Sequence, residues 1–173
     1  RCASGAMPGQ RRARTRFDRR VILNPIAVAI DQARKLHQVD RQNLQRIVEH
    51  AQHAFRTGRD CATQWVVLAD DLNTAEALAR IGIASDADSR ERIDGAQRVL
   101  ADVHQRQAQR GTWALRGPEL QALDDGLWVA RIQLEHCSLG EFDRARRDAA
   151  ERVRQARAGN APAGALVVEG ARA

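Results

Sequence analysis

The chain has 173 residues, of which 43% are hydrophobic and only 3% aromatic, and its formal charge is +6. This length and composition predict a single soluble globular domain that needs no disulfide or metal to bury a core. Cys2, Cys61 and Cys137 are odd in number and show no CxxC spacing, which favours a reducing cytoplasm. No apolar run approaches the ~20 residues of a membrane span, so we expect no membrane partner.

Residues 1–22 are rich in arginine and lack apolar periodicity, which predicts a disordered extension. They contain seven arginines and one acid, so they account for the whole formal charge of +6 and leave residues 23–173 neutral. The candidate basic arm consists of Arg11, Arg12, Arg14, Arg16, Arg19 and Arg20.

Three interpretations of this extension are open. As a basic arm, it would contact nucleic acid or anionic lipid. As an export signal, it would use the apolar stretch that follows Arg20, but Asn24 and Pro25 make that stretch too short. We favour the third interpretation, in which the segment is not native protein and the native start lies at Met7 or near Val21 or Leu23.

Apolar residues recur at helical spacing along the rest of the chain, and no segment shows strand-like alternation. The pattern predicts helices over residues 25–37, 41–57, 61–81, 89–110, 118–137 and 141–158. Asn24, Asp40 and Asp60 are the expected N-caps, and Gly58, Gly82 and Gly111 the expected ends. Because the loops are short, we expect an all-α antiparallel bundle of five to six helices over residues 23–158, with a disordered tail over 159–173.

The predicted fifth helix has more apolar surface than one stripe requires. Its stripe is complete with Leu120, Leu123, Leu127, Ala130 and Leu134. Trp128, Val129 and Ile132 lie off this stripe and form the candidate interaction face. A helix that is apolar all round is covered all round. Either this helix is central in the bundle, or its second face binds a partner, and in both cases we expect Trp128 to be covered. The preceding loop carries Trp113 and Leu115, which we expect to fold onto the core as a plug.

Candidate catalytic and metal-binding groups are weak. His50 and His53, with Glu49 beside them, could combine with His136 in a zinc site, but all three histidines lie off the apolar stripes, as surface residues do. Asp70 and Asp71 project about 100° apart on a helix, which is typical of a solvated face and not of an acid–base pair. The sequence has no phosphate-binding loop, GxSxG or HExxH motif. We therefore expect no enzyme activity and no cofactor.

Two features that could indicate nucleic-acid binding are also weak. Residues 74–95 resemble a helix-turn-helix superficially, but Asp86 and Asp88 at the start of its second helix would repel phosphate. The last helix carries six arginines together with four acids at three- and four-residue offsets, including Asp148 beside Arg152. This pattern is typical of a salt-bridged solvent face, so nucleic acid is not the favoured partner.

A loose set of residues spans about Asn24 to Arg147. It comprises Asn24-Pro25, Trp65, Leu68, Leu72-Asn73, Ala75-Glu76, Gly82, Gly111, Trp113, Glu119-Leu120, Gln133-Leu134 and Glu141-Phe142. In these residues the chain resembles uncharacterised small helical proteins of proteobacterial prophages and plasmids. The resemblance implies an accessory protein of a mobile element and carries over no site or activity.

The leading prediction is a cytoplasmic, non-enzymatic helical interaction protein whose partner is another protein or a second copy. The alternative is a nucleic-acid-associated protein that uses the basic arm.

Overall fold

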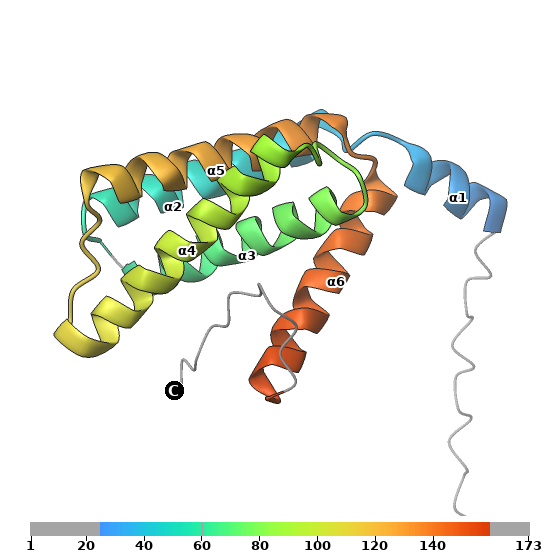
Figure 1. Ribbon diagram of the computed structural model, residues 1–173. Helices are drawn as coiled ribbons and strands as arrows, with labels where there is room; N and C mark the ends of the chain where they lie inside the picture. The colour runs from blue at the N-terminus through green and yellow to red at the C-terminus, as the bar shows by residue number, and fades with distance from the viewer. Residues whose placement is uncertain (1–24, 60, 160–173) are drawn as a thin grey trace, which may run out of the picture.

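The computed structural model describes residues 25–59 and 61–159 and consists of six α-helices (Figure 1). They are α1 (Pro25–Ala33), α2 (Gln38–Arg56), α3 (Cys61–Arg80), α4 (Ala87–Arg110), α5 (Gly117–His136) and α6 (Leu139–Arg157). Helices α2 to α5 run up and down as an antiparallel bundle, α6 diverges from it, and α1 projects away (Figure 1). The described residues contain no strand, and the all-α bundle prediction is confirmed.

Several helix ends are where the sequence predicts them, but the junction of α1 and α2 is not. Gly111 ends α4 in the left-handed conformation, with φ of +69°. The N-cap of α2 is His37, whose Nδ1 accepts a hydrogen bond from the Val39 amide at 3.3 Å, so the Asp40 prediction is wrong. Helix α1 stops at Ala33 because the next residues pack against α6, where Leu36 is only 5% exposed. The predicted Asp60 cap lies outside the described residues.

Helix α3 is the centre of the fold, since it contacts α2, α4, α5 and α6. Its Trp65 is 2% exposed and donates its indole N–H to the Leu100 carbonyl at 2.8 Å, which satisfies the one polar group of a buried ring. Trp113 and Leu115 of the α4–α5 loop pack against the same core cluster. The predicted plug is therefore confirmed.

Helices α4 and α5 form the most extensive interface in the structure. Gly126 of α5 makes it possible, because a Cβ at this position would lie 2.4 Å from the Ala96 Cβ and 3.0 Å from the Arg92 carbonyl oxygen. Glycine is unfavourable within a helix by about 1 kcal/mol relative to alanine. The close approach of the two backbones offsets that cost, since it brings the apolar faces of both helices into contact.

Helix α6 joins the bundle partly through charge. Arg152 donates to Glu76 of α3 at 2.8 Å, and the two side chains are only 11% and 19% exposed. Glu76 also accepts from the Gln97 amide of α4 at 3.4 Å. The spacing of Asp148 and Arg152 predicts that they pair on a solvent face, and this prediction is wrong. Asp148 instead pairs with Arg80 at 2.9 Å.

Candidate functional site

The three residues of the predicted interaction face do not share one surface. Trp128 is 52% exposed, whereas Val129 is 1% exposed and packs in a core cluster with Ile93 and two alanines of α3. Ile132 is only partly buried. The prediction of a single face is therefore wrong, because Val129 belongs to the bundle interior and only Trp128 among the three is largely open to solvent.

The structure explains why α5 is apolar on two sides. One side packs against α4 and another against α3, so a single chain covers both. The neighbouring helices of the described chain do not cover Trp128, because its indole lies beyond both contacts, and cover by a second chain stays a prediction. The Arg92 guanidinium of α4 lies over the ring, 5.8 Å from its centroid. This contact shields one face of the ring and leaves about half of the side chain in water.

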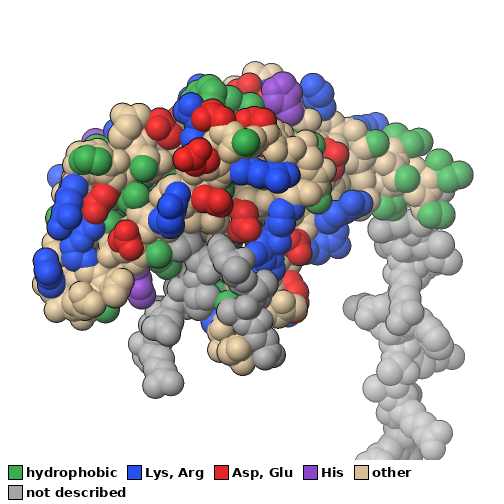
Figure 2. All heavy atoms as spheres, viewed as in Figure 1, with side chains coloured by type: hydrophobic (Ala, Val, Ile, Leu, Met, Phe, Trp, Pro, Cys, Tyr) green, Lys and Arg blue, Asp and Glu red, His purple; other side chains and the backbone are tan. Residues whose placement is uncertain are grey.

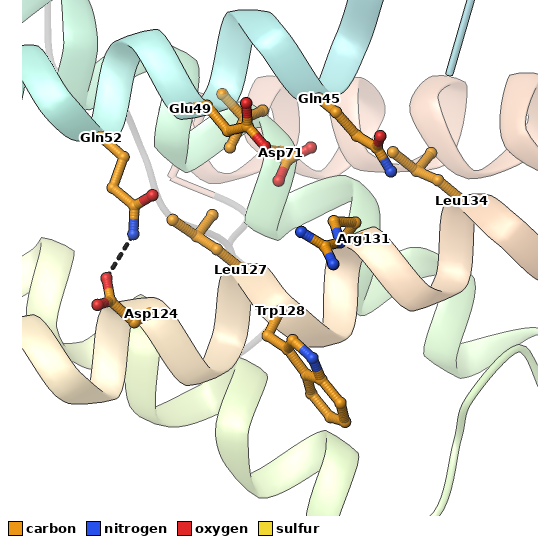
Figure 3. A pocket seen from close by; sticks show the side chains of 10 residues that line it. Gln45, Glu49, Gln52, Asp71, Asp124, Leu127, Trp128, Arg131 and Leu134 are labelled. Carbon is orange, nitrogen blue, oxygen red and sulfur yellow. Dashed lines mark hydrogen bonds between the residues drawn. The ribbon is translucent and has the colours of Figure 1, made fainter. Parts of the chain in front are cut away.

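A cavity of about 160 Å³ lies beside Trp128, between α2 and α5, with α3 as its floor (Figure 3). It exists because α2 and α5 make a much smaller interface with each other than either makes with α3. It is lined by Gln45, Val48, Glu49 and Gln52 of α2, Asp71 of α3, and Asp124, Leu127, Trp128, Arg131 and Leu134 of α5. We call this feature the Trp128 cleft.

Asp71 gives the Trp128 cleft its unusual electrostatics. Burial, and secondarily the negative charge of Asp70, raises the pKa of the Asp71 carboxyl from 3.8 to about 7. Its side chain is partly buried, so the predicted solvated face is wrong for Asp71, although Asp70 is exposed. The two acids point in different directions, as their 100° offset on the helix requires. Asp70 points outward, and Asp71 points toward the gap that α2 covers.

The other polar groups of the cleft come from α2 and α5. Asp124 of α5 accepts a hydrogen bond from Gln52 of α2, which closes one end of the cleft (Figure 3). Asp124 also accepts a hydrogen bond from Arg56 of α2. Glu49 lies on the same side as Asp71, and the Arg131 guanidinium extends into the space facing them (Figure 3). The cleft therefore offers acceptors, a donor and apolar walls within one small volume.

A cavity of this size is comparable with the ~150 Å³ engineered cavity that accepts benzene, so it has room for one side chain of a partner. Sequence reasoning identified Trp128 and missed the cleft. Leu127 and Leu134 read as ordinary stripe residues, and nothing in their spacing indicates that α2 would stand apart from α5. Gln133 was also missed: it is fully buried and donates to the Ala75 and Ile83 carbonyls at 3.1 and 2.9 Å, which fixes the α3–α4 connection against α5.

The candidate metal ligands are not brought together. His50, His53 and His136 are all exposed, and within residues 25–59 and 61–159 no three His, Cys, Asp or Glu side chains are grouped as a metal site. Burial raises the pKa of the Cys137 thiol to about 11, so this cysteine stays protonated and unreactive at neutral pH. The six arginines of the candidate basic arm lie outside the described residues, and binding of nucleic acid through them stays a prediction.

The described residues define an all-α bundle with an open cleft of mixed polar and apolar lining on one side. None of the helices in the described part of the chain is long and apolar enough to cross a membrane. The chain matches no protein-family model, no curated protein and no solved structure. The resemblance to helical proteins of prophages and plasmids stays a prediction.

Proposed function

We propose that this protein is a non-enzymatic helical interaction protein that binds a partner protein at the Trp128 cleft. The observation that carries the proposal is the exposure of Trp128, which is 52% open to solvent on a helix that is otherwise well packed. Tryptophan is enriched among the residues that contribute most to protein interfaces. A position on a rigid helix also reduces the entropy lost on binding, since the backbone is already ordered.

The cleft supports a partner that covers the indole and inserts one side chain beside it. Leu127 and Leu134 provide apolar contact, Arg131 provides a hydrogen-bond donor, and Asp71 provides a carboxyl group. A partner side chain with an apolar stem and a polar tip matches this arrangement.

The test compares Trp128→Ala with Ile81→Ala, a control that removes another exposed apolar side chain, 40% exposed, at the end of α3. Proteins retained by the wild type and by Ile81→Ala but lost by Trp128→Ala are purified, and their affinities are measured by titration calorimetry. We expect Trp128→Ala to weaken binding by about 30-fold or more, the effect of a hot-spot residue. Equal retention by all three proteins would contradict the proposal.

The same variant separates binding from folding. Because Trp128 is half exposed, its removal leaves no closed cavity, and we expect the free energy of unfolding to fall by less than about 1 kcal/mol. A loss of about 3–5 kcal/mol in a urea melt, as for a buried tryptophan, would show that Trp128 is a core residue instead.

A further inference from the structure

Helix α1 exposes an apolar surface that the other described residues do not bury. None of its nine residues is buried, and the side chains of Ile26 and Ile30 are 68% and 56% exposed. Hydrophobic side chains gather over α1 where it projects from the molecule (Figure 2). Its single charged residue is Asp31. A helix this short is marginal in water on its own, so its stability requires contact with another surface.

The base of α1 is fixed on α6, which sets the direction of the helix. The Arg34 carbonyl accepts a hydrogen bond from the Leu139 amide at 2.8 Å, and Leu36 is buried in the cluster beneath. Gly140 permits the crossing, since a Cβ there would lie 2.9 Å from the Gln32 Cβ. Turning α1 back onto its own bundle would break these contacts, so its apolar face is directed outward.

A groove of matching character lies on another side of the molecule, between α2, α3 and α6. It has a volume of about 670 Å³ and its walls are mainly apolar. Ile47 of α2 and Val66 of α3 are 55% and 40% exposed there. The charged residues that line the groove are Arg146, Arg154 and Arg157 of α6 and Asp70 and Asp71 of α3, so arginines outnumber acids there. We call this feature the α2–α6 groove.

We propose that α1 of one copy docks in the α2–α6 groove of a second copy, and that the exchange is reciprocal. The nine-residue α1 is roughly 13 Å long, about half the length of the nineteen-residue α6 that forms one wall, so it fits within the groove. Docking covers Ile30 with Ile47 and Val66, and it places the one acid of α1 opposite the arginines of the rim. A reciprocal exchange forms a closed two-fold dimer and doubles the buried area.

Trp128 belongs neither to α1 nor to the groove, although Val48 and Asp71 line both the groove and the Trp128 cleft. We therefore expect Trp128→Ala to leave self-association unchanged. A partner that fails to bind at the Trp128 cleft would not affect this inference, and a monomeric protein would not affect the proposed function.

The first experiment is sedimentation equilibrium of the full chain and of three variants. Ile30→Glu places a charge on the apolar face of α1, and Ile47→Glu places one in the groove. Val39→Glu is the matched control, because Val39 is 53% exposed on α2 but does not line the groove. We expect the wild type and the control to be dimeric and the other two variants to dissociate at least about 30-fold more readily, since burying an unpaired carboxylate is costly.

The second experiment identifies the occupant of the groove. Ile30→Cys chains are mixed with Val66→Cys chains, both carrying Cys2→Ser, and the mixture is oxidised. Disulfide-linked pairs of the two different chains are expected, and circular dichroism should show unchanged helix content in each variant. A monomeric wild type, an unaffected Ile30→Glu dimer, the absence of disulfide links between the two different chains, or chemical cross-links from the groove to residues 160–173 would each overturn the inference.

Discussion

The α4–α5 interface and the attachment of α6 differ in how they are held together. Between α4 and α5, a glycine brings two backbones close and apolar side chains pack around it, while an ion pair of Arg106 with Glu119 adds to the contact. Between α3 and α6, a partly exposed ion pair contributes to the contact, and an open groove borders the helix. The first arrangement fixes a rigid core, because close packing tolerates little change in shape.

The second arrangement leaves surface available. Both proposed binding surfaces occur where the helices of the bundle separate: the Trp128 cleft between α2 and α5, and the α2–α6 groove beside α6. The densely packed α4–α5 pair thus gives the more loosely attached helices a defined framework. Substitutions in the two halves should therefore differ in size and kind.

The largest effect is expected at the close approach of α4 and α5. Gly126→Ala should lower the free energy of unfolding by about 3 kcal/mol, since the new Cβ would lie 2.4 Å from the Ala96 Cβ. The higher helix propensity of alanine, about 1 kcal/mol, is too small to reverse the sign. Urea denaturation followed by circular dichroism measures the change.

Gly95→Ala on α4 is the matched control, because nothing lies within 4 Å of a Cβ at that position. Here only the propensity acts, so the variant should be more stable than the wild type by about 0.5–1 kcal/mol. If both glycine variants were stabilised, α4 and α5 would not approach as closely as the structure shows.

The attachment of α6 should respond less strongly. Arg152→Met removes the partner of Glu76 and should cost about 2 kcal/mol, less than the 3–5 kcal/mol of a fully buried pair, because the two side chains keep 11% and 19% of their exposure. Arg146→Met removes an exposed α6 arginine that lies 3.9 Å from Asp70, and should cost less than about 0.5 kcal/mol. Equal costs in thermal or urea melts would mean that the pair with Glu76 does not hold α6 in place.

The sequence predicts what depends on neighbours along the chain. The 3.6-residue period located all six described helices. The prediction that Gly111 ends α4 is confirmed, because a left-handed glycine at a helix end follows from local chemistry. The junction near His37 was not predicted, because it is set by the burial of Leu36 against α6. The residues of α6 lie more than one hundred positions further along the chain.

The candidate site depends almost entirely on such distant contacts. Val129 and Trp128 are adjacent and both apolar, yet one is buried and the other exposed because of where α3 and α4 happen to lie. In the sequence, Gly126 indicates only a lower helix propensity. The position of Ala96 in the structure shows that a side chain at residue 126 would not fit. Asp71 reads as half of a solvated doublet, and the covering helix that raises its pKa cannot be inferred from its neighbours.

The smallest of these effects concerns Asp71, and its sign depends on pH. Burial raises the pKa of Asp71 in the folded protein to about 7, whereas the ordinary value of 3.8 applies to the unfolded chain. Between these two values the folded state retains a proton that the unfolded state has lost. Stability therefore falls as the pH rises from about 4 to about 7, and this contribution is constant above that range.

Asp71→Asn should remove this fall, because an amide does not ionise. The variant should match the wild type near pH 4 and exceed its free energy of unfolding by about 1 kcal/mol near pH 8, a fraction of the full linkage value since Asp71 is only partly buried. Asp70→Asn removes only the secondary cause of the raised pKa, so its pH profile should lie between the other two. Parallel profiles of wild type and Asp71→Asn in urea melts across this range would show that the carboxyl is solvated and that α2 does not cover it.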